Sequence, residues 1–442
     1  MPEIKLDTQQ RTAANKRMKI GFISTRIAGA DGVSLEIAKL ATICGRLGHQ
    51  VCYCAGELEP WLVAEQGRLV PEMHFAHPEA RWIHDHSFGT TEAATGLRER
   101  IATMAAGLKA VITRFVADFG VEVLFVQNAL AIPMHIPLAV ALHDYIAETG
   151  IPTLAHNHDL PWERERFAVN CIPDVLERCF PPNLPSVRHL VINSLAQAAL
   201  WERKRIAATV FPNIFDFAAA APGISDFNAD LRQALGLRED QLFILQPTRV
   251  IGRKGIELTI ELVRRLRAAP NRARLAGKEA VLVITHPAGD EGLEYLERVL
   301  AWARAADVPL LYVADRFAAK AGWQDGRKIY SLWDAYIHAD FVTYPSFIEG
   351  FGNALLETIY FRLPALVNRY PVYAADIAAV GFDLIEIAGT ITDQAVEATI
   401  AVLADPVRRR RMVERNYELA RSRYSYEAVT PLLASLLEAV RP

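Results

Sequence analysis

Two glutamates, Glu349 and Glu357, are the residues of this chain best spaced for chemistry. Seven residues separate them, in a segment that follows an apolar run typical of a strand and leads into a helical pattern from Ala354 to Phe361. The loop between strand and helix consists of Gly350, Phe351, Gly352 and Asn353. Such a loop exposes backbone N–H groups at a helix N-terminus, where they can hold anionic or hydroxyl-rich groups. We predict that Glu349 in the loop and Glu357 in about the first turn of the helix face the same crevice.

A basic turn precedes this segment in the sequence. The stretch from Pro247 to Gly255 follows another strand-like run and leads into a helix, and it contains Arg249, Arg253 and Lys254. Two fixed cations in such a turn can hold a diphosphate and stabilise the charge that develops on a leaving group. We predict this role for Arg249 and Lys254 and expect Arg253 to point to solvent.

A cluster of histidines ends a strand-like run in the first half of the chain. His156, His158 and Asp159 lie within four residues of one another. Three interpretations stay open for this cluster: contacts with a substrate, a zinc site, and a structural histidine pair. Nothing else in the sequence supports a metal site.

The glycine-containing loop from Ala28 to Ser34 lies at a strand-to-helix turn, where Rossmann-like domains bind phosphates. It lacks the full G-x-G-x-x-G pattern, which argues against a dinucleotide cofactor. We predict Gly29, Asp31 and Gly32 as substrate contacts. Asp31 could orient an acceptor hydroxyl, or it could be the N-cap of the following helix.

These motifs need elements that position them, and the hydrophobic pattern supplies alternating strands and helices. In the first half we expect strands at 18–24, 50–54, 123–126, 152–155 and 189–193, and helices at 33–47, 91–119, 139–149 and 195–205. In the second half we expect strands at 242–246, 281–285, 309–313 and 341–344, and helices at 256–268 and 426–440. Alternation of this kind predicts two α/β domains with parallel sheets, which bind ligands at the carboxyl ends of their strands.

The break in the pattern predicts the domain boundaries. The segment from Phe211 to Asp216 interrupts the alternation, and 218–227 has no period, so we place the hinge there. The predicted ranges are a flexible tail at 1–17, a first domain at 18–216, a second domain at 217–425 and a final helix at 426–442.

The segment EGFGNALLE, from Glu349 to Glu357, resembles the signature of the family 4 retaining glycosyltransferases, and the Arg249–Lys254 turn fits the same family. The resemblance runs from Met18 onward. It implies the GT-B fold, in which two Rossmann-like domains face each other across a cleft and the last helix crosses back to the N-terminal domain. The first domain would then be on the acceptor side, and the second would bind the nucleotide sugar.

The resemblance also implies roles for individual residues. Glu349 would approach hydroxyls of the donor sugar, Glu357 would bind the ribose, and the amides of 350–353 would line the sugar and diphosphate. Arg249 and Lys254 would hold the diphosphate. His158 is the better match to a family histidine that reaches the transferred sugar, with His156 as the reserve candidate and Asp159 beside them.

Composition narrows the function classes further. The chain has 442 residues and a formal net charge of -3, which argues against general attraction to nucleic acid or anionic lipid. The sequence has neither a membrane-spanning apolar run nor a signal peptide. The five cysteines have no metal-type spacing, and Cys52 and Cys54 fit buried strand positions. We therefore expect a cytoplasmic protein.

The sequence thus predicts a retaining, metal-independent glycosyltransferase without a cofactor. The segments 156–167 and 368–377 are similar to transferases that build small soluble glycosides. This resemblance implies transfer of a hexosyl group from a nucleotide sugar, such as GDP-mannose or UDP-glucose, to a small soluble acceptor such as a glycosylglycerate. We expect no nucleic-acid partner and no integral membrane association, and leave a homo-oligomer open. The alternatives are a non-hydrolysing sugar-nucleotide epimerase, which would convert the donor without an acceptor, and an inactive nucleotide-sugar sensor.

Overall fold

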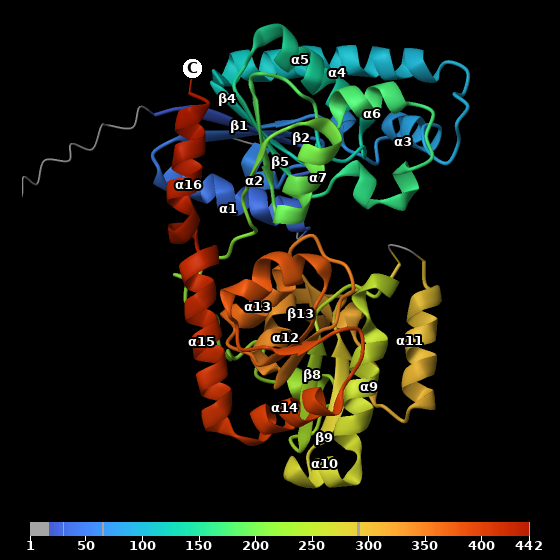
Figure 1. The fold of residues 1–442 in the computed structure, drawn as a ribbon, viewed down its shortest axis with the longest axis vertical. Coiled ribbons are helices and arrows are strands. Elements are labelled where there is room, and N and C mark those ends of the chain that lie inside the picture. Colours follow the sequence, from blue (N-terminus) through green and yellow to red (C-terminus); the bar gives the residue numbers. More distant parts are fainter. Residues whose placement is uncertain (1–16, 30, 64–65, 290–291, 442) are drawn as a thin grey trace, which may run out of the picture. The chain divides into compact units, whose positions relative to one another are not determined.

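The protein contains two Rossmann-like α/β sheets and a small third sheet (Figure 1). The computed structural model describes residues 17–29, 31–63, 66–289 and 292–441. The predicted tail at 1–17 therefore falls, except for Arg17, outside the described residues, as does Ala30 of the predicted substrate loop.

The first sheet has the strand order β3-β2-β1-β4-β5-β6-β7. Its strands are β1 (Lys19–Ser24), β2 (Gln50–Ala55), β3 (Gly67–Leu69), β4 (Val123–Gln127), β5 (Thr153–Asn157), β6 (Val187–Val191) and β7 (Ala208–Val210). The helices of this part are α1 (Gly32–Arg46), α2 (Pro60–Val63), α3 (Pro78–Asp85), α4 (Leu97–Phe119), α5 (Ile136–Thr149), α6 (Pro173–Cys179) and α7 (Ser194–Lys204). Every residue of β4 and β5 is buried, because helices cover both faces of a parallel sheet of this type.

The second sheet has the order β10-β9-β8-β14-β15-β16. Its strands are β8 (Gln241–Gln246), β9 (Glu279–Ile284), β10 (Leu310–Tyr312), β14 (Phe341–Tyr344), β15 (Ala365–Asn368) and β16 (Ile385–Ile387). The helices are α8 (Leu231–Ala234), α9 (Ile256–Arg267), α10 (Ala269–Arg274), α11 (Glu294–Ala305), α12 (Leu332–His338), α13 (Asn353–Tyr360), α14 (Asp393–Ala404), α15 (Pro406–Tyr424) and α16 (Tyr426–Ala439).

Both sheets change direction at the same place in their topology. The strand order reverses between β1 and β4 in the first sheet and between β8 and β14 in the second. Ligands of open parallel sheets bind outside the carboxyl ends of the strands at such a switch point. The predicted loops after β1, β8 and β14 lie at these ends, so the fold places the predicted chemistry where this architecture binds ligands.

Contacts divide the chain into two compact units, Met1–Leu190 with Leu432–Pro442, and Val191–Pro431. Residues 191–216 thus group with the second unit, although the sequence suggested a boundary after Asp216. The ranges 18–216, 217–425 and 426–442 stay predictions. Within the first unit, burial and the charge of Arg441 lower the pKa of His49, so the C-terminal end of the chain lies near that ring.

Two local predictions were wrong, and one small sheet was not predicted. The helix expected at 91–119 begins at Leu97, because Gly96 adopts a φ of 79° that ends the preceding turn. The strand expected at 189–193 ends at Val191, and Asn193 is instead the N-cap of α7. The small sheet of β11 (Phe317–Ala318), β13 (Arg327–Ser331) and β12 (Gly322–Gln324) was not foreseen, because its strands are very short.

Candidate active site

A buried ion pair joins the two predicted motifs of the second unit. The Nζ atom of Lys254 donates a hydrogen bond to Oε1 of Glu349, although the two residues are 95 positions apart in sequence. The side chains of Lys254 and Glu349 are only 8% and 10% exposed. The loop after β8 and the loop after β14 therefore form one charged cluster.

Backbone geometry holds these two loops together. The N–H of Phe347 donates to the carbonyl of Arg253 over 2.8 Å. Gly255 has a φ of 62°, and a Cβ atom there would lie 2.5 Å from the carbonyl oxygen of Pro345. Only glycine fits this position, because both the conformation and the contact exclude a side chain. This approach places the end of the 3-10 turn Gly252–Lys254 beside Glu349.

Burial and the mutual attraction of the two groups determine the ionisation of Lys254 and Glu349. Burial opposes ionisation of Glu349, but the charge and hydrogen bond of Lys254 outweigh it and lower the pKa of the carboxyl group. Burial also lowers the pKa of Lys254, and the charges of Arg253 and Arg249 act in the same direction, against Glu349. Glu349 is therefore an anion at neutral pH, able to accept hydrogen bonds from hydroxyl groups.

The orientation of Arg253 differs from what its position in the sequence suggested. Arg253 does not point to solvent: its guanidinium donates to the carbonyl of Ile348 over 3.1 Å and lies 3.7 Å from Oε2 of Glu349. Arg249 is the exposed cation of the turn. Its charge acts on both Lys254 and His286.

His286, two residues after the end of β9, was missed by the sequence analysis. Burial, then the charges of Lys254 and Arg249, lower its pKa to about 4. The ring is therefore neutral at physiological pH, and its Nδ1 lies 3.1 Å from the hydroxyl of Thr285. Its position at a strand end, Thr-His-Pro, was the one available sequence signal.

The loop of Gly350, Phe351, Gly352 and Asn353 is held through its carbonyl groups. Asn193 donates to the carbonyl of Gly350 over 2.7 Å, and the Tyr370 hydroxyl donates to that of Phe351. Gly352 has a φ of 133°, and a Cβ there would lie 2.6 Å from the Tyr370 hydroxyl.

The N–H groups of these four loop residues donate no hydrogen bond to any part of the chain that the structure describes. They precede or begin α13, whose N-terminus carries a partial positive charge. Unbonded donors at this place suit an anionic or hydroxyl-bearing ligand.

Glu357 is the fifth residue of α13 and so lies just beyond the first turn, where it was predicted. Its Oε2 accepts a hydrogen bond of 2.8 Å from the hydroxyl of Tyr336, a buried residue of α12. Tyr336 was not foreseen, since nothing in the local sequence connects it to the loop. It fixes the orientation of the second glutamate.

In the first unit, both predicted histidines form hydrogen bonds with the same glutamine side chain. His156 Nδ1 and His158 Nε2 each lie 3.1 Å from Oε1 of Gln127, the last residue of β4. The two rings are 4.2 Å apart. Each ring nitrogen must carry its proton to donate to that oxygen, so the network fixes both tautomers.

The His158 ring is neutral for a physical reason. Burial, followed by the positive charge of Lys39, lowers its pKa to about 4. Lys39 pairs over 2.6 Å with Glu36, whose side chain is 1% exposed. His158 therefore donates from Nε2 to Gln127 and can accept a hydrogen bond at Nδ1, but it is not a cation at neutral pH.

The zinc interpretation of this cluster does not fit the geometry. Asp159 forms an ion pair of 2.5 Å with Arg164, while the two histidines share Gln127. Within the described ranges, no group of three or more histidine, cysteine or acidic residues is arranged to hold a metal ion. The amides of His158 and Asp159 both donate to the side chain of Asn128.

The loop after β1 caps a helix. Asp31 accepts hydrogen bonds from the amides of Val33 and Ser34 and pairs with Arg26 over 3.1 Å, which confirms the N-cap interpretation. Gly29 has a φ of 74°, and its N–H donates to Glu59. Gly32 begins α1.

A cavity of about 150 Å³ lies at the carboxyl ends of β1 and β4. Arg26, Asp31 and Gln127 are among its lining residues, together with the ring of Phe75. It combines one cation, one carboxylate, amide groups and an aromatic face. Such a set suits a small polar molecule.

Comparisons with known proteins agree with this layout, although no family model matches the chain. The chain is 30% identical over 384 residues to the mannosylglucosylglycerate synthase of Petrotoga mobilis, covering 84% of this chain and 86% of the relative. It belongs to that family of glycosyltransferases. It is also 29% identical over 454 residues to the mannosylglucosylglycerate synthase of Thermotoga maritima, covering 94% of this chain and 99% of the relative.

Solved structures show the same fold for this mannosylglucosylglycerate synthase family member. HepE of Anabaena, in complex with UDP and glucose, matches with a TM-score of 0.62 at 14% identity, covering 96% of this chain and all of HepE. The protein is thus a GT-B glycosyltransferase, as the sequence predicted. Among the described residues, no helix has the length and apolar character needed to cross a membrane.

Proposed function

We propose that this enzyme transfers a mannosyl group from a nucleotide donor of the GDP-mannose type to a glucosylglycerate-type acceptor, with retention of anomeric configuration. The buried Lys254–Glu349 pair carries the proposal, because it joins a cation suited to a diphosphate with a carboxylate suited to sugar hydroxyls. Both relatives are mannosylglucosylglycerate synthases, which supports the mannosyl donor and the glucosylglycerate acceptor.

The diphosphate of the donor would bind to the second unit. Arg249 is exposed in the turn after β8, and Lys254 closes that turn. The unbonded amides of 350–353 provide further donors at the N-terminus of α13. Fixed positive groups of this kind stabilise the charge that develops on the leaving diphosphate.

Glu349 would bind hydroxyls of the transferred sugar. Its lowered pKa keeps it ionised, so it accepts hydrogen bonds and does not donate a proton to the leaving group. When the donor binds, Lys254 can divide its N–H groups between Glu349 and a phosphate oxygen, because an ammonium group has three donors. Glu357, oriented by Tyr336, would accept hydrogen bonds from the ribose.

The acceptor would bind to the first unit, at the cavity beyond β1 and β4. A glycerate carboxylate suits the guanidinium of Arg26, which lines this cavity. The neutral His158 ring, at the end of β5, would contact a sugar hydroxyl. The Gln127 side chain links the cavity lining to the histidine pair.

The chemistry would need neither a metal nor an amino-acid base. In a front-face displacement, the acceptor oxygen attacks the anomeric carbon as the bond to the diphosphate breaks. The acceptor's proton passes to the departing diphosphate oxygen. The protein contributes orientation and fixed charge, with Arg249 and Lys254 in the place that a divalent ion takes in other transferases.

The five cysteines support the cytoplasmic location that the sequence suggested. All five are buried, and none of them forms a disulfide. Burial raises the pKa of Cys44 and of Cys54 to about 12, which keeps both thiols protonated and unreactive. Free buried thiols are typical of a reducing compartment.

Release of nucleoside diphosphate tests this function. The purified enzyme would be offered GDP-mannose, GDP-glucose, UDP-glucose and UDP-galactose with a chelator, each with and without glucosylglycerate. We expect release from one guanosine donor, accelerated by the acceptor and insensitive to chelation. Donor conversion without acceptor would support an epimerase, binding without turnover a sensor, and loss of activity with chelator would overturn metal independence.

A further inference from the structure

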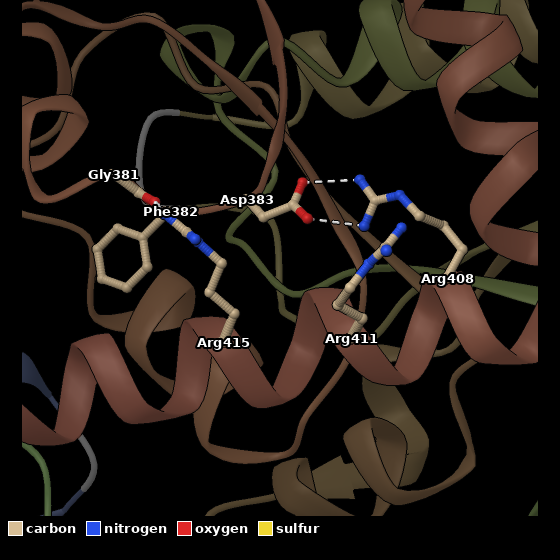
Figure 2. A pocket seen from close by; sticks show the side chains of 6 residues that line it. All are labelled: Gly381, Phe382, Asp383, Arg408, Arg411 and Arg415. Carbon is tan, nitrogen blue, oxygen red and sulfur yellow. Dashed lines mark hydrogen bonds and ion pairs between the residues drawn. The ribbon is translucent and has the colours of Figure 1, made fainter.

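A second cavity, which is basic, lies on the long helix α15. The proposed reaction does not use it. It has a volume of about 460 Å³. Figure 2 shows three arginine side chains of α15 and the segment 381–383 around it. The lining residues are Gly381, Phe382, Asp383, Arg408, Arg411 and Arg415. With three guanidinium groups and one carboxylate, the lining carries a net charge of +2.

Arg408 is the one of these three arginines that is paired with a carboxylate. Arg408 makes two hydrogen bonds to the carboxylate of Asp383, of 2.7 and 2.8 Å (Figure 2). The backbone of Asp383 is in turn held by Asn416, which accepts from its N–H and donates to its carbonyl over 2.7 Å each. These contacts join the 381–383 segment to α15 in a defined position.

The other two arginines keep their charge available. Arg415 donates to the carbonyl of Gly381 through Nη2 over 3.1 Å and Nε over 3.4 Å, so its plane is fixed while other N–H groups stay unused. Arg411 has no partner among the described residues. Residues four apart lie on the same face of a helix, where like charges repel each other.

Nearby acidic side chains do not cancel this charge. Glu414 on the same helix accepts two hydrogen bonds from Arg362, and Glu418 pairs with Arg421. Asp405, the N-cap of α15, is engaged by the helix amides. The positive charge of Arg411 and Arg415 therefore has no counter-ion within the chain as described.

We propose that this cavity binds a small phosphate-bearing anion with at least two negative charges, such as inorganic diphosphate or a sugar phosphate. Guanidinium groups present paired N–H donors that match the oxygens of a phosphate group. A dianion would balance the net charge of +2 and relieve the repulsion between Arg411 and Arg415. Gly381, which lines the cavity, has a φ of 84°, and a Cβ atom there would lie 3.7 Å from Nη2 of Arg415.

Calorimetric titration with inorganic diphosphate tests the proposal. Because Lys254 is expected to bind diphosphate as well, the titration is run on the Lys254→Ala protein and on the wild type. We expect one diphosphate site in Lys254→Ala. The added change Arg411→Ala or Arg415→Ala should lower the affinity of that site by at least about tenfold, because each change removes a charged hydrogen bond to the anion. The matched control is Arg410→Ala, an exposed arginine of the same helix that does not line the cavity.

The outcomes separate clearly. Binding that survives Lys254→Ala and Arg410→Ala but is lost with Arg411→Ala supports the site. Absence of binding in both Lys254→Ala and a wild type saturated with nucleoside diphosphate would overturn it. An equal loss with Arg410→Ala would also overturn it, because the helix would then attract anions through its general charge. Far-ultraviolet circular dichroism checks that each variant is folded.

Discussion

The two units hold their predicted site residues by different physical means. In the second unit, Lys254 and Glu349 form a buried ion pair with Arg253 beside it. In the first unit, His156 and His158 share one oxygen of Gln127, and the His158 ring is neutral. Charge suits the stabilisation of a leaving diphosphate, whereas neutral donors and acceptors suit the recognition of hydroxyl groups. We therefore expect the loss of a charged contact to reduce the activity more than the loss of a neutral one.

The largest expected effect comes from Glu349→Gln. We expect kcat to fall by about 10²–10³-fold, because the neutral amide removes fixed charge next to the reacting sugar. The measurement is the initial rate of nucleoside diphosphate release. The control is Glu239→Gln, an exposed glutamate of the same unit. The thermal unfolding of Glu349→Gln is measured as well, because the buried Lys254 loses its charged partner in this variant. A folded variant with near-normal kcat would remove the proposed role.

The next effect concerns a property that both units share. His158 and His286 each have a pKa of about 4, against about 6.5 in an unfolded chain. The unfolded state therefore binds more protons, so their stabilising contribution is complete above pH 6.5 and is lost as the pH falls towards 4. Each neutral ring contributes on the order of 3 kcal/mol to the pH dependence of unfolding.

Denaturant unfolding between pH 4 and 8 measures this slope. We expect His158→Asn and His286→Asn each to reduce it. His143→Asn is the control, since that ring lies beside Asp144 near the surface. Unchanged slopes in both test variants would contradict the neutral state of the two rings.

A smaller effect is expected from His158→Ala in the neutral cluster. Losing one hydrogen bond to a substrate hydroxyl costs about 1–2 kcal/mol, which corresponds to about a tenfold lower kcat/KM. Steady-state kinetics with varied acceptor measure it, and His49→Asn serves as a control, because His49 is a buried histidine of the same unit that does not line the cavity beyond β1 and β4. If His158→Ala were as damaging as Glu349→Gln, the contrast between the two units would fail.

The smallest effect is expected at Asp31. Its carboxylate caps α1, so Asp31→Ala should lower the free energy of unfolding by about 1 kcal/mol. Asp31→Ser, which can still cap the helix, should restore most of it. We expect activity to change only a few-fold. A loss of activity in Asp31→Ser despite restored stability would instead assign Asp31 to acceptor binding.

The sequence predicted what is encoded locally and missed what depends on distant contacts. The strands before the site loops and the start of α13 follow from short hydrophobic runs and glycines. Arg253 was misjudged because its orientation depends on the 345–349 loop, almost a hundred residues away. Gln127 in the first unit, and His286 and Tyr336 in the second, were missed for the same reason. Each lies near predicted site residues of its own unit but comes from another strand end or helix, and a single sequence does not show that proximity.

The most direct measurement is the proton NMR spectrum of the reaction of GDP-α-mannose with glucosylglycerate, recorded over time with a chelator present. We expect a new anomeric signal of an α-mannoside that grows in step with release of GDP. We expect no such signal with Glu349→Gln under the same conditions. A β-linked product would contradict retention, and conversion of the donor without any linked product would contradict glycosyl transfer to this acceptor.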